Sequence, residues 1–261
     1  MIDFVQAQNA FQEYLKDYDT QDGNIALKIR HTYEVVDKSE YLAKALKLDQ
    51  DNLMLAKLIA LLHDIGRFEQ VKQTSDFSDA SGFDHAKYGV KVLFEDGLIR
   101  KFIQDERYDG IIRDAIWQHN QYEITGILDK PNLMHCQIIR DADKLDNFRV
   151  KEVEPFENIF PKRYNPETIA YETISPKVYK DFMERRCIQT KDRQTQLDYW
   201  VCVLAFIFDL NFSQSIQYVR EHGYIDKLID RISYEREETK KKMENIRECA
   251  KEYMEERGVE L

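Results

Sequence analysis

The sequence predicts an all-α protein. Nine glycines and five prolines are the only strong helix breakers among 261 residues. In most of the longer segments, apolar residues recur at i, i+3, i+4 and i+7, the pattern of an amphipathic helix, and do not alternate as in a half-buried strand. With 43% apolar residues, the chain can bury a sizeable core. Its length favours one large helical domain, or one domain with a helical extension.

Six helices are expected in the first part of the chain. Asp51 and Asp84 stand where N-caps would be, and Gly66 and Gly97 stand where helices would stop. Residues 70–82 are polar and rich in Ser, Asp and Thr, which predicts a mobile surface loop. The expected helices cover residues 2–18, 24–47, 51–64, 84–96, 108–119 and 131–149.

Four more helices are expected in the second part. Residues 155–166 hold three of the five prolines, so they should not form a regular helix and should mark the seam between a core and a C-terminal part. The apolar run 199–208 is about half of the roughly 20 residues that span a bilayer, which predicts a buried helix. The expected helices cover residues 176–188, 191–210, 213–221 and 231–257.

Charge and cysteine content narrow the function classes. The chain has 38 Lys and Arg against 48 Asp and Glu, a formal charge of −10. That balance disfavours a partner that is a nucleic-acid polymer but allows a small anionic substrate in a local positive pocket. The first residues lack a basic segment followed by a long apolar one, so we expect a cytoplasmic protein that does not bind a membrane. The four cysteines show no CxxC pair and should be reduced thiols.

Five polar residues occupy positions where a purely structural helical protein would place apolar ones. They lie on inward stripes or at the ends of apolar runs: His31, His63, Asp64, His119 and Asp143. A buried carboxylate without a cation costs several kcal/mol. Inward aspartates among inward histidines therefore indicate a metal site.

These residues resemble the HD superfamily of metal-dependent phosphohydrolases, with His31, then HDIG at 63–66, then RDADKLD at 140–146. The resemblance implies a helical bundle of the HD-domain type with additional C-terminal helices. Its metal-binding core would be residues 24–149 and its extension 167–261, within a single domain 1–261.

The resemblance also implies the ligands. His31, His63, Asp64 and Asp143 would hold one ion, and Asp143 is preferred to Asp141 and Asp146 because the family's aspartate follows a small residue.

His85 and His119 resemble the extra histidines of relatives that hold two ions. Asp64 would then bridge the ions and be the central catalytic residue. Imidazole and carboxylate ligands suit Fe, Mn, Co, Ni or Zn, and no thiolate is placed to select zinc.

Two cations with such ligands can lower the pKa of a bound water and hold phosphoryl oxygens, which predicts hydrolysis of a phosphate ester or anhydride. Arg67 and Lys144 are expected to bind the substrate phosphate, with Lys162 and Arg163 as weaker candidates. His135 and His222 are expected to be structural.

The predicted substrate is a small phosphorylated compound, with a nucleotide as the leading candidate. Gly66-Arg67 departs from the acidic pair of guanosine tetraphosphate hydrolases, and Asn120 departs from the second histidine of cyclic-di-GMP phosphodiesterases. Two alternatives stay open: a two-iron oxygenase of the same superfamily, and a nucleotide sensor without turnover. The oligomeric state is left open.

Overall fold

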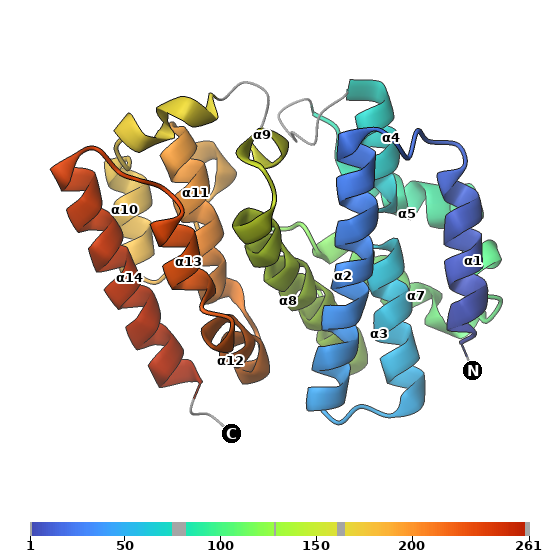
Figure 1. Ribbon diagram of the computed structural model, residues 1–261. Coiled ribbons are helices and arrows are strands. Elements are labelled where there is room, and N and C mark those ends of the chain that lie inside the picture. Colours follow the sequence, from blue (N-terminus) through green and yellow to red (C-terminus); the bar gives the residue numbers. More distant parts are fainter. Residues whose placement is uncertain (1, 75–81, 128, 161–164, 259–261) are drawn as a thin grey trace. The chain divides into compact units, whose positions relative to one another are not determined.

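The computed structural model describes residues 2–74, 82–127, 129–160 and 165–258, and every regular element in these ranges is helical (Figure 1). The prediction of an all-α fold is confirmed. The chain forms two compact units, Met1–Asp146 and Asn147–Leu261. The organisation as a single domain with a core over 24–149 stays a prediction. Among the described helices, none combines the length and the apolar character that crossing a membrane requires.

The first unit is built around α2 (Gly23–Ala45) and α3 (Gln50–Leu62), which pack side by side (Figure 1). Each begins at an aspartate whose carboxylate accepts backbone N–H bonds from the first turn: Asp22 for α2, and Asp49 for α3. The expected cap Asp51 instead lies inside the first turn of α3. Leu58, Leu61 and their apolar neighbours on α3 are fully buried, so this helix forms the centre of the unit.

Shorter helices surround this pair. They are α1 (Phe4–Leu15), α4 (Ile65–Thr74), α5 (His85–Val90), α6 (Ile99–Phe102) and α7 (Asp109–Gln118), with a π turn at Lys91–Glu95 and a 3-10 turn at Glu106–Tyr108. The first part of α8 (Lys130–Val153) completes the unit, and the helix continues into the second unit. Asp84 caps α5 as predicted, accepting a bond from the Lys87 amide at 3.0 Å.

Helix α4 contradicts two predictions. Gly66 does not end a helix, and residues 70–74 are helical rather than part of a loop; residues 75–81 lie outside the described residues. The helix forms because Phe68 and Val71 bury an apolar stripe at helical spacing. Gly66 is needed inside it for a different reason: a Cβ there would lie 2.2 Å from the carbonyl oxygen of His85. The glycine lets α4 and α5 approach closely.

The second unit contains α9 (Phe156–Ile159), α10 (Pro176–Met183), α11 (Gln196–Leu204), α12 (Ser213–Glu221), α13 (Tyr224–Asp230) and α14 (Glu237–Arg257), with 3-10 turns at Pro166–Tyr171, Thr190–Asp192 and Ala205–Asp209. Trp200 is fully buried and its indole N–H donates to the Leu228 carbonyl at 3.0 Å. This bond ties α11 to α13 inside the core of the unit.

Several predicted boundaries in this unit are wrong. The expected helix 191–210 is interrupted, because Thr195 and Asp198 form a capping box that starts α11, and its end tightens into a 3-10 turn. Helix α13 was not predicted. The proline-rich stretch 155–166 contains the single turn α9. Lys162 and Arg163 lie outside the described residues.

Candidate metal centre

Six side chains that the sequence singled out come from six different places in the first unit. His31 lies in the middle of α2, His63 is the C-cap of α3, Asp64 joins α3 to α4, His85 opens α5, His119 is the C-cap of α7, and Asp143 lies on α8. All are buried except Asp143, whose side chain is 22% exposed. Burial of this many ligand-type side chains in one unit is the first structural sign of a metal centre.

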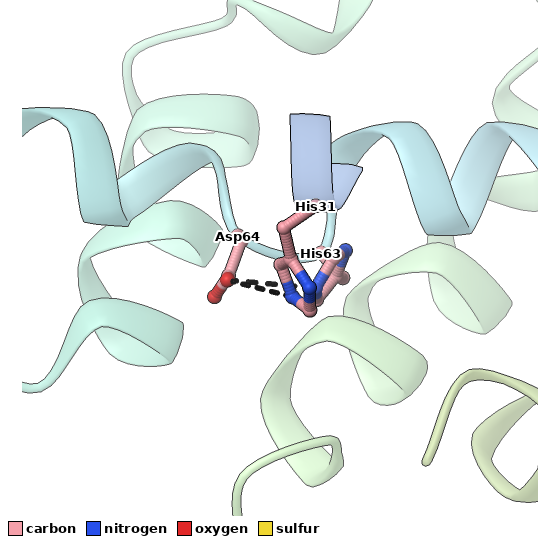
Figure 2. A group of neighbouring side chains, drawn as sticks. All are labelled: His31, His63 and Asp64. Carbon is pink, nitrogen blue, oxygen red and sulfur yellow. Dashed lines mark ion pairs between the residues drawn. The ribbon is translucent and has the colours of Figure 1, made fainter. Parts of the chain in front are cut away.

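The first ligand group gathers around one oxygen of Asp64. Asp64 Oδ2 lies 3.5 Å from His63 Nε2 and 3.7 Å from His31 Nε2 (Figure 2). Asp143 approaches the same two imidazoles, with its Oδ1 3.1 Å from His31 Nε2 and 3.9 Å from His63 Nε2. His31, His63 and Asp64 are close enough to hold one ion, and Asp143 faces the same space.

The second ligand group gathers around the other oxygen of Asp64. Asp64 Oδ1 lies 3.4 Å from His85 Nε2 and 3.6 Å from His119 Nε2, and these two nitrogens are 3.1 Å apart. Asp64 is therefore shared, with one oxygen directed to each pair of histidines.

The spacing of these atoms fits metal ions. Nitrogen and oxygen ligands about 2.1 Å from one ion, at angles of about 90° to 110°, are separated by roughly 3.0 to 3.4 Å. The separations given above run from 3.1 to 3.9 Å, so the shorter ones fall within this range and the longer ones exceed it. The described residues thus contain two His/Asp clusters that could bind divalent metal.

The histidine tautomers also fit. The Nδ1 of His63 donates to the Ala60 carbonyl at 2.7 Å, and that of His119 donates to the Ile116 carbonyl at 2.6 Å. A neutral imidazole carries one N–H, so each ring then presents the lone pair of Nε2 to the cluster. Within the described part of the chain, His63 Nε2 is buried and has no hydrogen-bond partner. Burial lowers the pKa of His63 to about 4, which keeps it neutral and able to ligate at pH 7.

Positive side chains balance the buried carboxylates. Lys28 Nζ lies 2.6 Å from Asp64 Oδ2. Burial opposes ionisation of Asp64, but Lys28, followed by the neighbouring imidazoles, outweighs it and holds the pKa of Asp64 well below its usual range. For Asp143, burial is likewise outweighed by His31, so the pKa of Asp143 is also lowered. Both aspartates are therefore carboxylates at neutral pH.

His31 lies between two carboxylates. Its Nδ1 is 2.6 Å from Asp146 Oδ2, on the side opposite Asp143. Burial lowers the pKa of His31, but its hydrogen bonds to Asp143 and Asp146 prevail, and the pKa is raised from the ordinary value. Asp146 therefore contacts the side of the His31 ring that faces away from the cluster.

The structure describes contacts of both predicted substrate-binding residues, Arg67 and Lys144. Arg67 Nε is 3.6 Å from Asp64 Oδ1, and its Nη1 donates to Gln70 Oε1 at 2.7 Å. Lys144 is buried and donates to the carbonyl of Arg140, one turn earlier on α8, at 3.5 Å. The contact of Lys144 with a substrate stays a prediction.

The remaining histidines bind elsewhere. His135 Nε2 pairs with Asn52 Oδ1 at 3.0 Å, and His222, the C-cap of α12, donates from Nδ1 to the Tyr218 carbonyl at 2.8 Å. The four cysteines are free thiols, as predicted.

The sequence did not point to three residues beside the cluster. Lys28 precedes His31 by one helical turn, and that spacing could have signalled it. The sequence presented Asp146 only as an alternative to Asp143 as a metal ligand. Arg140 is buried, and its guanidinium donates to the carbonyls of Gln118, Gln121 and Tyr122, which holds the turn that carries His119. No local sequence pattern indicated this role of Arg140, because the carbonyls that it contacts follow α7, far from Arg140 in the sequence.

An all-α fold that brings histidines and aspartates from several helices around a shared carboxylate defines a protein with a candidate metal centre. The family model of the HD domain matches residues 29–147, so this part of the chain is an HD domain, as its motifs predicted.

Comparison with curated proteins finds a deoxyguanosinetriphosphate triphosphohydrolase-like protein of Agrobacterium fabrum (strain C58), which is 36% identical over 89 residues. The match covers 32% of this chain and 20% of the relative, so the chain spans about a fifth of the length of the curated protein it matches. No solved structure matches the chain.

Proposed function

We propose that the protein is a metal-dependent phosphohydrolase that holds two divalent transition-metal ions and cleaves a small phosphorylated compound. The observation that carries the proposal is the shared carboxylate of Asp64, whose Oδ2 faces His31 and His63 and whose Oδ1 faces His85 and His119. A carboxylate placed in this way supports two ions at once. His31, His63, Asp64 and Asp143 are the proposed ligands of one ion, and Asp64, His85 and His119 those of the other.

When bound, the ions supply a water of lowered pKa and fix phosphoryl oxygens. Side chains of the protein would bind the remaining phosphate oxygens and neutralise their charge. Arg67 reaches the Oδ1 side of Asp64 with a planar fork of donors, which suits a phosphate and gains strength as charge develops on the transferred group. Lys144, next to Asp143 on α8, is the second proposed phosphate contact.

A nucleotide is the proposed substrate class. The Agrobacterium relative is named for a deoxynucleoside triphosphate, which makes deoxynucleoside triphosphates the first compounds to test. The net charge of −10 favours a small anion over a nucleic-acid polymer.

The proposal is tested by metal analysis of anaerobically purified protein, followed by a phosphate-release screen across nucleoside mono-, di- and triphosphates with Mn²⁺, Co²⁺, Ni²⁺, Zn²⁺ or Fe²⁺. We expect metal-dependent release of phosphate, pyrophosphate or triphosphate at the same rate with and without oxygen. Turnover that requires oxygen would instead support a two-iron oxygenase. Tight nucleotide binding without turnover, in metal-loaded protein, would support a sensor.

A further inference from the structure

We infer that Asp146 is a positioning residue that fixes the tautomer and orientation of His31 and thereby sets the metal affinity of the first ligand group. The inference rests on the proposed function, since it assigns the metal-holding role of His31. It concerns an aspartate that touches no proposed ion.

The geometry places Asp146 behind the ligand. Its Oδ2 lies 2.6 Å from His31 Nδ1, while the other ring nitrogen, Nε2, faces Asp64 and Asp143. The imidazole is 3% exposed and Asp146 is fully buried, so no water competes for this bond. A carboxylate acceptor at Nδ1 favours the tautomer with its proton on Nδ1, which leaves the Nε2 lone pair for an ion.

One face of α8 supplies both contacts of the ring. Asp143 and Asp146 are three residues apart on this helix and therefore lie on the same side of it. His31 inserts between them, with one nitrogen near each carboxylate. The packing of α8 against α2 therefore determines the direction of His31 Nε2.

A buried lysine also contacts Asp146. Lys38 Nζ lies 3.4 Å from Asp146 Oδ1 and 2.5 Å from Glu34 Oε2, and Lys38 is only 5% exposed. Lys38 follows His31 by two helical turns on α2, so both act on Asp146 from the same helix face. A fully buried carboxylate would cost several kcal/mol without such partners. Burying an aspartate and a lysine in the core costs desolvation free energy. This cost argues that the contact of Asp146 with His31 has a functional role.

His31 differs in this respect from two other ligands. His63 and His119 are oriented by carbonyls of their own helices, which no side-chain substitution removes. His31 is oriented by a carboxylate from another helix. Its orientation can therefore be changed without touching the ligand.

The test measures metal affinity, not only activity. Asp146→Asn keeps the shape and removes the charge, and Asp141→Asn is the matched control, because Asp141 is equally buried on the same helix. Titration with Co²⁺ or Mn²⁺ should show that Asp146→Asn weakens one of two binding steps by about 10- to 100-fold, with an altered Co²⁺ absorption spectrum. Asp141→Asn should bind like the wild type.

The outcomes are distinguishable. A folded Asp146→Asn protein with wild-type affinity in both steps overturns the inference and leaves the proposed function standing. A wild-type protein that binds no ion overturns the proposed function and the inference with it. If Asp146→Asn does not fold, ¹H–¹⁵N spectra of the wild-type protein loaded with Zn²⁺ decide: a proton on His31 Nδ1 supports the inference, and its absence overturns it.

Discussion

Replacing Gly66 by alanine should disable the second ligand group while the rest of the fold stays in place. A Cβ on Gly66 would lie 2.2 Å from the His85 carbonyl oxygen, whereas ordinary contact begins at 3.4 Å. The obstacle is backbone and cannot rotate away, so α4 and the start of α5 must separate by roughly 1 Å, at a cost of about 1 to 3 kcal/mol.

His85 carries this displacement directly, because the obstructing oxygen is its own. His85 Nε2 is 3.4 Å from Asp64 Oδ1 in the undisturbed protein. A shift of about 1 Å at a reacting centre costs on the order of 100-fold in turnover. We expect such a loss, together with a weaker second metal-binding step.

The assay combines Mn²⁺ titration, phosphate release and thermal unfolding. Gly110→Ala is the matched control, since Gly110 lies in α7 and a Cβ there would meet nothing within 4 Å. It should stabilise the protein by up to about 1 kcal/mol, as expected for a glycine in a helix, and leave both ions bound. A folded Gly66→Ala protein with wild-type metal content and turnover would refute the reasoning.

Three further predictions concern the cluster. Asp64→Ala should abolish phosphate release and lower metal content more than His85→Ala does, because one carboxylate serves both groups. Asp141→Ala should have a far smaller effect. Metal analysis and kinetics measure both effects, and activity retained in Asp64→Ala would contradict the whole assignment. Arg67→Ala should keep its metal but lose about ten- to a thousand-fold in turnover, with part recovered in Arg67→Lys; wild-type turnover in Arg67→Ala would mean that the phosphate is held elsewhere. Metal affinity should rise with pH through the range in which His31 loses a proton, because the raised pKa of His31 means that protons compete with the ion for this side chain. Calorimetry in buffers of different ionisation enthalpy should detect the released proton, and an affinity that does not change with pH would contradict the mechanism.

Helical period was enough to predict the long helices and some short ones, such as α12, but not α4 or α13. Helices α2, α3, α7 and α8 were located because their apolar stripes repeat over several turns. Helix α4 was missed because Gly66 resembled a stop signal. Its actual role depends on the backbone of His85, which is distant in sequence and invisible to any local pattern.

The candidate site shows a similar division. The ligand-type residues could be named from the sequence because polar side chains on inward stripes stand out, and their spacing resembles a family pattern. Which oxygen of Asp64 faces which histidines depends on how α5 and α7 pack. The partners Lys28 and Asp146 depend on the rotation of α2 and α8 about their axes, which determines the side chains that meet across them.

The shared carboxylate also has a thermodynamic consequence. If both ligand groups hold ions, as proposed, they would not fill independently, because they use the two oxygens of the same carboxylate, Asp64. An ion on one side would withdraw charge from the carboxylate and restrict its motion, so an ion on the other side would bind an altered ligand. By linkage, whatever factor the first ion imposes on the affinity of the second, the second imposes on the first. Metal binding to this protein should therefore be cooperative, positively or negatively. The coupling free energy between the two binding steps would measure how strongly Asp64 links the two ligand groups.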